Sequence, residues 1–130
     1  VKVDREKIKI IFPNPILFDT GSAKLKLDAL WILGELASKL KELPENEVIV
    51  EGHTDNIPFK LGGKISSNWE LSLYRALSIV HYFTEVEEIN PERFIPIGYG
   101  EYRPLFPNDT PEHRAQNRRI EISIIRKTEL

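Results

Sequence analysis

The sequence predicts an α/β two-layer sandwich, in which a mixed β-sheet is covered by helices on one face. Two long segments, 26–43 and 68–85, repeat apolar residues at the helical spacing of three and four. Segments rich in β-branched residues alternate with them along the chain. The last of these, 118–126, alternates isoleucine with polar residues, as in a strand that meets a core on one side only. The resulting order of strand, helix, strand, helix, strand, loop and strand is typical of a mixed sheet.

The chain begins with a predicted strand at Lys7–Phe12, which a Pro-Asn-Pro triplet ends because proline lacks an amide donor. We expect an extended segment to resume at Ile16–Phe18. Residues 1–15 are then a lead-in with the first strand, and residues 16–130 form the domain proper. Because the first residue is valine and not methionine, we expect the chain to be a piece of a longer protein.

The middle of the chain holds the two helices and a strand between them. The helix at 26–43 ends at Pro44, which cannot continue a helix. A strand follows at Glu47–His53, where three β-branched residues stand in a row. The helix at 68–85 begins at a Ser-Ser-Asn stretch that suits an N-cap. Its predicted buried face consists of Leu73, Ala76, Leu77, Val80 and Phe83.

The last part of the chain contains two more predicted strands. Arg93–Gly98 is the third, and a loop with a helical turn at 112–117 follows it. Arg118–Arg126 is the final strand. Neighbouring residues of a strand point to opposite faces, so Arg118 and Arg119 cannot both serve one site. A solvated strand face is the plainer interpretation of this pair.

Composition and charge limit the function. The chain has 130 residues, no cysteine and a net charge of −2. The absence of cysteine excludes a thiol nucleophile, a cysteine-ligated zinc and an iron–sulfur site. A duplex-binding domain usually carries a basic excess, so nucleic acid is disfavoured as a partner. No apolar run approaches the ~20 residues that a membrane helix needs.

Two polar clusters indicate a binding site. A Gly-His-Thr-Asp string ends at Asp55, just after the strand at 47–53, and sites in α/β sheets usually lie at such strand ends. On the second helix, Asn68, Leu71 and Arg75 share one face. Asp55 would bind an ammonium and Arg75 a carboxylate, which are the two ends of an α-amino acid. The same side chains would equally form a structural salt bridge, and the residues alone favour that plainer interpretation.

His53 raises the question of an enzyme, as a metal ligand or a catalytic residue beside Asp55. The three histidines show neither H-x-x-x-H nor H-E-x-x-H spacing, and no further ligand is indicated. A G-x-S-x-G elbow for a hydrolytic triad is absent from the sequence. We therefore predict no metal, no cofactor and no catalytic residue, and we expect His53 to support a neighbouring site residue by a hydrogen bond. Trp31 is expected in the core or at an interface edge, and Trp69 beside the pocket.

Four ordered motifs resemble the OmpA-like peptidoglycan-binding domain. They are Gly52–Asp55 (G-H-T-D), Asn68–Ala76 (N-W-E-L-S-L-Y-R-A), Gly98–Pro104 (G-Y-G-E-Y-R-P) and Asn117–Glu121 (N-R-R-I-E). With an early Phe18-Asp19 segment, the resemblance covers about residues 16–126, nearly the whole chain. The string T-D-N-I-P-F, a long spacer and then S-N-W-E-L-S is similar to the MotB-like branch of the family, which belongs to the flagellar motor stator.

The resemblance implies a non-catalytic domain that anchors a flagellar stator to the cell wall by noncovalent peptidoglycan binding. It implies that Asp55 holds the ammonium, and Arg75 the carboxylate, of the diamino acid in the peptidoglycan stem peptide. The other ligand-binding residues that it implies are Asn68, Leu71, Thr54, Phe18 and Asp19.

The resemblance also implies a setting. The domain would be periplasmic, would follow a single inner-membrane helix, and would act as a homodimer with a MotA-like stator protein as partner. The alternative within the family is an outer-membrane-tethered anchor of the OmpA or Pal type. The alternative of another class is a hydrolase of cell-wall peptides that uses His53 and Asp55.

Overall fold

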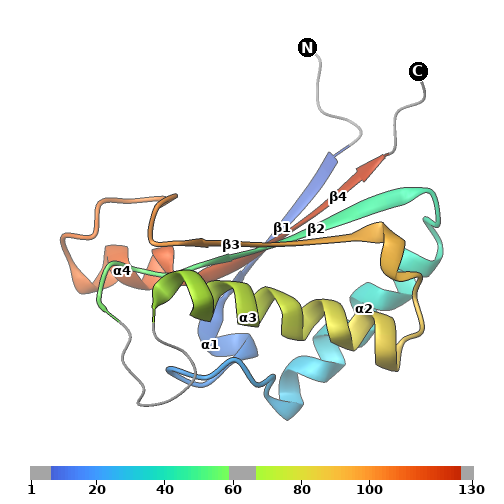
Figure 1. The fold of residues 1–130 in the computed structure, drawn as a ribbon, viewed down its shortest axis with the longest axis horizontal. Helices are drawn as coiled ribbons and strands as arrows, with labels where there is room; N and C mark the ends of the chain where they lie inside the picture. The colour runs from blue at the N-terminus through green and yellow to red at the C-terminus, as the bar shows by residue number, and fades with distance from the viewer. Residues whose placement is uncertain (1–6, 59–66, 127–130) are drawn as a thin grey trace.

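The computed structural model describes residues 7–58 and 67–126 (Figure 1), so part of the expected lead-in and of the long spacer lies outside the described residues. The elements are β1 (Lys7–Pro13), α1 (Asn14–Leu17), α2 (Leu27–Lys41), β2 (Asn46–His53), α3 (Asn68–His81), η1 (Tyr82–Val86), η2 (Pro91–Arg93), β3 (Phe94–Gly100), α4 (Pro111–Asn117) and β4 (Arg119–Arg126). The strands, the two long helices and the helical turn before the last strand follow in the predicted order, and α1, the π-helical turn η1 and the 3-10 turn η2 are additional. Among these described helices, none has the length and apolar character that a membrane crossing requires.

The four strands form one mixed sheet in the order β1-β4-β2-β3. β4 runs antiparallel to both of its neighbours, β1 and β2, whereas β2 and β3 are parallel. Figure 1 shows α1, α2 and α3 together on one side of this sheet. The predicted α/β class, with a mixed sheet and helices on one face, is therefore confirmed.

The core lies between the sheet and the helices. Alternate residues of the two central strands point into it, and they are Val48 and Val50 of β2 and Ile120, Ile122 and Ile124 of β4. The helices contribute the fully buried side chains of Leu33, Leu40 and Ile79. Burying one such side chain stabilises the fold by about 1.5–3 kcal/mol, so this layer is the main source of stability.

α3 lies directly against β2 and β3, because glycine stands at the contact in both strands. A Cβ atom at Gly52 or at Gly98 would collide with the backbone of Ser72 or Leu73. The hydroxyl of Ser72 also accepts a hydrogen bond from the amide of Gly100, at 2.9 Å. These contacts fix the distance between the polar start of α3 and the loop that follows β2.

The extended segment predicted at Ile16–Phe18 is wrong, since Ile16 and Leu17 belong to α1. Pro15 stands in the first turn of this helix, where the missing amide proton costs no hydrogen bond. The amide of Phe18 donates to the carbonyl of Asn14, at 2.8 Å, and closes the turn. Phe18 itself is extended and forms an isolated bridge with Leu25.

The buried face of α3 is also shifted from the prediction. Leu73, expected in the core, is 37% exposed. Leu71 and Arg75 are buried instead. Ser72 and Arg75 point inward because Ser72 is hydrogen-bonded to the sheet and Arg75 binds backbone carbonyls. The prediction counted only apolar residues, so it did not identify this part of the buried face.

Candidate ligand-binding site

A pocket of about 660 Å³ lies where the loop after β2, the start of α3 and the segment from α1 to α2 meet. The residues that line it include all seven for which the sequence predicted a role in ligand binding: Phe18, Asp19, Thr54, Asp55, Asn68, Leu71 and Arg75. Arg118, which the sequence did not select, also lines it. The structure therefore brings residues from distant parts of the chain to one cavity of a size that suits a small ligand.

Asp55 is held in place from several sides. Its Oδ1 accepts a hydrogen bond from the amide of Ile57, at 3.0 Å, and its Oδ2 forms an ion pair with Nη1 of Arg118, at 2.6 Å. The side-chain amide of Asn68 donates to the carbonyls of Asp55 (3.3 Å) and Ile57 (3.0 Å) and so joins α3 to this loop. The Thr54 hydroxyl donates to the Asp55 carbonyl as well, at 2.8 Å. The carboxylate is thus oriented before any ligand arrives.

Arg75 is a buried cation, with only 5% of its surface exposed. Its Nε donates to the carbonyl of Ser22, at 2.7 Å, and its Nη2 to the carbonyl of Asp19, at 3.3 Å. The guanidinium carbon lies 5.2 Å from the ring centroid of Phe18. Burial, together with the charge of Arg118, lowers the pKa of Arg75 to about 10, so the group stays charged at neutral pH.

No carboxylate among the described residues pairs with Arg75, and the ion pair of Asp55 is made with Arg118. The mutual salt bridge considered for Asp55 and Arg75 is therefore not formed in this part of the chain. A guanidinium carries more donors than two carbonyls use. Within the described ranges, Arg75 is left with a buried charge and spare donors, which is the arrangement that attracts an anionic group.

Arg118, just before β4, and Arg119, its first residue, point in opposite directions, as predicted, but the interpretation as a solvated strand face is wrong. Arg118 has a 40% exposed side chain and reaches the pocket. Arg119 is buried, and its Nε donates to Glu121 at 2.6 Å. The alternation of side chains in an extended segment predicts that Arg118 and Arg119 point apart. It does not predict that Arg118 lies within reach of Asp55.

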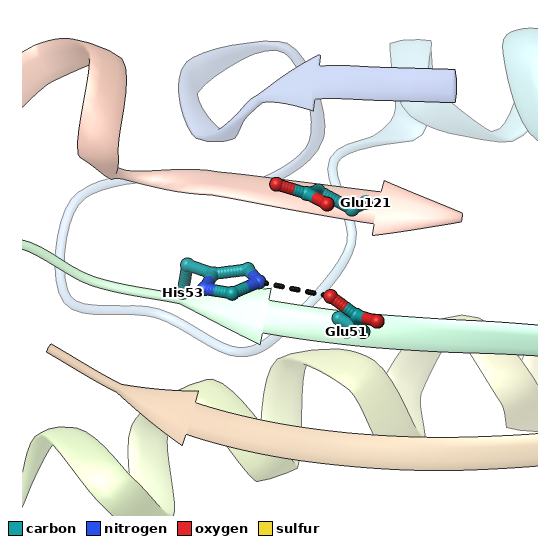
Figure 2. Close-up of side chains that lie close together, drawn as sticks. All are labelled: Glu51, His53 and Glu121. Atoms are coloured by element: carbon teal, nitrogen blue, oxygen red, sulfur yellow. Dashed lines mark hydrogen bonds and ion pairs between the residues drawn. The ribbon is translucent and has the colours of Figure 1, made fainter. Parts of the chain in front are cut away.

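His53 lies on the other face of the sheet, outside the residues that line the pocket. Figure 2 shows it beside Glu51 and Glu121. One imidazole nitrogen of His53 and one carboxylate oxygen of each glutamate, the atoms that could bind a metal, lie within 4.8 Å of one another. The hydrogen bond of His53 Nε2, at 3.2 Å, joins Glu51. We expected His53 to support a pocket residue by a hydrogen bond. The hydrogen bond that the structure describes goes to Glu51, which does not line the pocket, so this expectation is wrong.

Charge decides how this three-residue cluster is interpreted. Lys9 and Arg119 both bind the carboxylate of Glu121, at 2.9 and 2.6 Å. Although burial opposes it, these two cations lower the pKa of Glu121, and burial and Arg119 lower the pKa of His53. With a neutral His53, two cations balance two carboxylates. A divalent metal would add positive charge beside Arg119 and would compete with Lys9 and Arg119 for the Glu121 carboxylate. We therefore interpret the cluster as a balanced ionic network and not as a metal site.

Both tryptophans lie at the surface. Trp31, expected in the core or at an interface edge, is 73% exposed, so it is not a core residue. Trp69 follows Asn68, which lines the pocket, and is 51% exposed. Its ring stacks on Tyr102, with centroids 4.8 Å apart.

Residues 17–118 match the OmpA family. YtxE of Bacillus subtilis, an uncharacterized protein, is 40% identical over 123 residues, which are 95% of this chain and 50% of that protein. Motility protein B of Bacillus subtilis is 35% identical over 124 residues, or 95% of this chain and 47% of that protein. This chain thus spans about half the length of these curated relatives.

Two solved structures share the fold. A putative MotB-like protein from Desulfovibrio vulgaris superimposes with a TM-score of 0.89 at 32% identity, covering 95% of this chain and 78% of the other. The periplasmic domain of Helicobacter pylori MotB gives a TM-score of 0.83 at 25% identity, covering 98% of this chain and 88% of the other. The family match contains all the pocket residues that the sequence predicted. Taken together, the match and the shared fold show that the chain belongs to the OmpA family and is a non-catalytic domain.

Proposed function

We propose that the chain binds peptidoglycan noncovalently, by holding the diamino acid of the stem peptide in the pocket. Asp55 takes the ammonium of that residue, and Arg75 takes its carboxylate. The buried charge of Arg75 carries the proposal, because its described hydrogen bonds go only to neutral carbonyl oxygens. A ligand carboxylate would supply the missing counter-charge and would match the planar guanidinium with two parallel hydrogen bonds.

The remaining pocket residues have supporting roles in this proposal. Asn68 holds the loop that carries Asp55, and Leu71 offers an apolar wall to the methylene chain of the ligand. Phe18 packs against the Arg75 guanidinium, Thr54 holds the Asp55 backbone, and Asp19 lies at the rim.

We further propose that this binding anchors a flagellar-type stator to the cell wall. The similarity to Motility protein B and to two MotB structures supports this setting, as does the long spacer after Asp55. In the whole protein the domain would then be periplasmic, tethered by an inner-membrane helix, dimeric and partnered by a MotA-like stator protein.

A second setting is an anchor tethered to the outer membrane. It is favoured by the 32% identity with Outer membrane protein A of Bordetella avium, over 117 residues and 90% of this chain. Any sequence that precedes this domain in the whole protein would discriminate the two settings. A membrane helix with an ionisable residue supports the stator, whereas a lipid-attachment site or a barrel segment supports the outer-membrane anchor.

Co-sedimentation with purified cell wall tests the binding. Asp55→Asn and Arg75→Ala should each lose at least about 30-fold in affinity. The first leaves the ammonium of the ligand without its partner, and the second leaves the carboxylate of the ligand without its partner. Arg75→Lys keeps the charge but loses the fork, so it should fall between the parent and Arg75→Ala. Free diaminopimelic acid should compete with the wall better than lysine, which lacks the second carboxylate.

Matched controls come from exposed charges outside the pocket, Asp28→Asn and Lys39→Ala on α2. These should sediment with the wall like the parent. Urea unfolding of every variant separates loss of binding from loss of fold. If folded Asp55→Asn and Arg75→Ala proteins bind the wall as the parent does, the pocket assignment is wrong.

A further inference from the structure

A stacked pair of exposed aromatic rings, Trp69 and Tyr102, stands beside the pocket. The two rings are 51% and 52% exposed, and their planes meet at 27°. The stack covers one face of each ring, yet about half of each residue's surface is exposed. Exposing two large aromatic rings side by side is unfavourable in water, which makes such a pair a candidate contact surface.

Neither ring lines the pocket, but both lie on segments that are bonded to residues of its wall. Trp69 follows Asn68 on α3, and Asn68 binds the carbonyl of Asp55. Tyr102 stands two residues after Gly100, whose carbonyl accepts a hydrogen bond from the amide of Thr54, at 2.9 Å. A ligand that fills the pocket and continues past the start of α3 would therefore meet the aromatic pair next.

An acidic side chain flanks the rings. The Glu101 carboxylate lies beside the Tyr102 hydroxyl. Exposed aromatic rings with polar groups at their edge suit a sugar. A pyranose ring offers C–H groups to an aromatic face, and its hydroxyl and acetamido groups offer hydrogen bonds to the edges.

We propose that Trp69 and Tyr102 bind the glycan strand of peptidoglycan while the pocket holds the stem peptide. The proposal rests on the proposed function and extends it from the peptide to the sugar. The chemistry of the ligand agrees with this division, because the diamino acid is joined to the sugar through a lactyl group and two amino acids, which span about 10 Å when extended.

Binding of two soluble ligands tests the proposal: the free stem tripeptide and the same tripeptide attached to its disaccharide. The parent should bind the disaccharide form more tightly. Trp69→Ala should weaken the disaccharide form roughly two- to tenfold, the range for a single aromatic contact, and leave the free tripeptide unchanged. Tyr102→Leu should act in the same direction and serves if Trp69→Ala does not fold. Trp31→Ala, which removes an exposed tryptophan on α2, is the matched control and should change neither ligand.

Fluorescence gives a second readout, because the chain has two tryptophans and Trp31→Phe leaves Trp69 as the only one. The disaccharide ligand should shift the emission of Trp69, and the free tripeptide should not. The proposal is overturned if Trp69→Ala binds the disaccharide form like the parent, or if it weakens both ligands by the same factor. A parent that binds the tripeptide but gains nothing from the sugar sinks this proposal alone. A parent that binds neither ligand sinks the proposed function.

Discussion

Replacing Gly52 by alanine tests whether α3 lies on the sheet as closely as the structure shows. The new Cβ would lie 2.1 Å from the carbonyl oxygen of Ser72, which is about 1.3 Å short of the 3.4 Å at which ordinary contact begins. The colliding atom belongs to a helix backbone and cannot rotate away, so α3 must move. Overpacking costs about 1–3 kcal/mol where side chains yield. We expect about 3 kcal/mol or more here, a large part of the 5–15 kcal/mol typical of a domain.

Urea unfolding measures this loss, which should lower the midpoint by about 1 M or more. Gly34→Ala in α2 is the matched control. Its Cβ would lie 3.3 Å from the Tyr82 hydroxyl, the end of a side chain, so its free energy of unfolding should stay within about 1 kcal/mol of the parent. Gly52→Ala should also weaken wall binding, because the movement separates Arg75 from Asp55. A Gly52→Ala protein as stable as the parent would refute the close contact.

Three further predictions concern the cap, a loop and pH. Ser67 is the N-cap of α3, and its hydroxyl accepts a hydrogen bond from the amide of Glu70 at 3.3 Å. Ser67→Ala should lower the free energy of unfolding, measured in urea, by about 1 kcal/mol, whereas Ser67→Asp should keep most of the stability of the parent. Asn117→Ala should lower the free energy of unfolding by about 3 kcal/mol. The buried side-chain oxygen of Asn117 accepts hydrogen bonds from the backbone N–H groups of Leu105 and Phe106, and both groups would lose their partner. An unchanged urea midpoint would contradict this prediction. Burial lowers the pKa of His53, so below about pH 6.5 the unfolded chain takes up a proton more readily than the folded one. Stability should therefore fall as pH drops below that value, and His53→Gln should flatten the slope of melting temperature between pH 7 and 5; an identical slope refutes the link.

The order and type of the main elements could be predicted because each carries a local periodic signal. The isoleucine alternation of β4 and the apolar repeats of α2 are examples, and their bounds differ from the prediction by two residues at most. Local signals failed at α1, where proline was taken only as a break. In this segment Pro15 also starts a helical turn, and the turn buries Leu17 in the core.

The pocket residues that could be predicted are those that belong to the motifs of the resemblance. The resemblance selected Asp55 and Arg75, and the structure places them in one cavity. Arg118 was missed because its role depends on strand pairing between distant segments. His53 was expected near the site for its place in the Gly-His-Thr-Asp string, but strand alternation directs its side chain to the opposite face of the sheet.

The position of β4 has a consequence for how the molecule is made. β1 is paired only with β4 among the described strands, and the paired residues Lys7 and Ile125 stand at opposite ends of the chain. Closing so long a loop is slow, and the first strand must wait until the last one has left the ribosome. Arg118, which completes the pocket, arrives with that last strand. A chain that ends before β4 would therefore lack both the partner of β1 and Arg118, and its pocket would be unfinished.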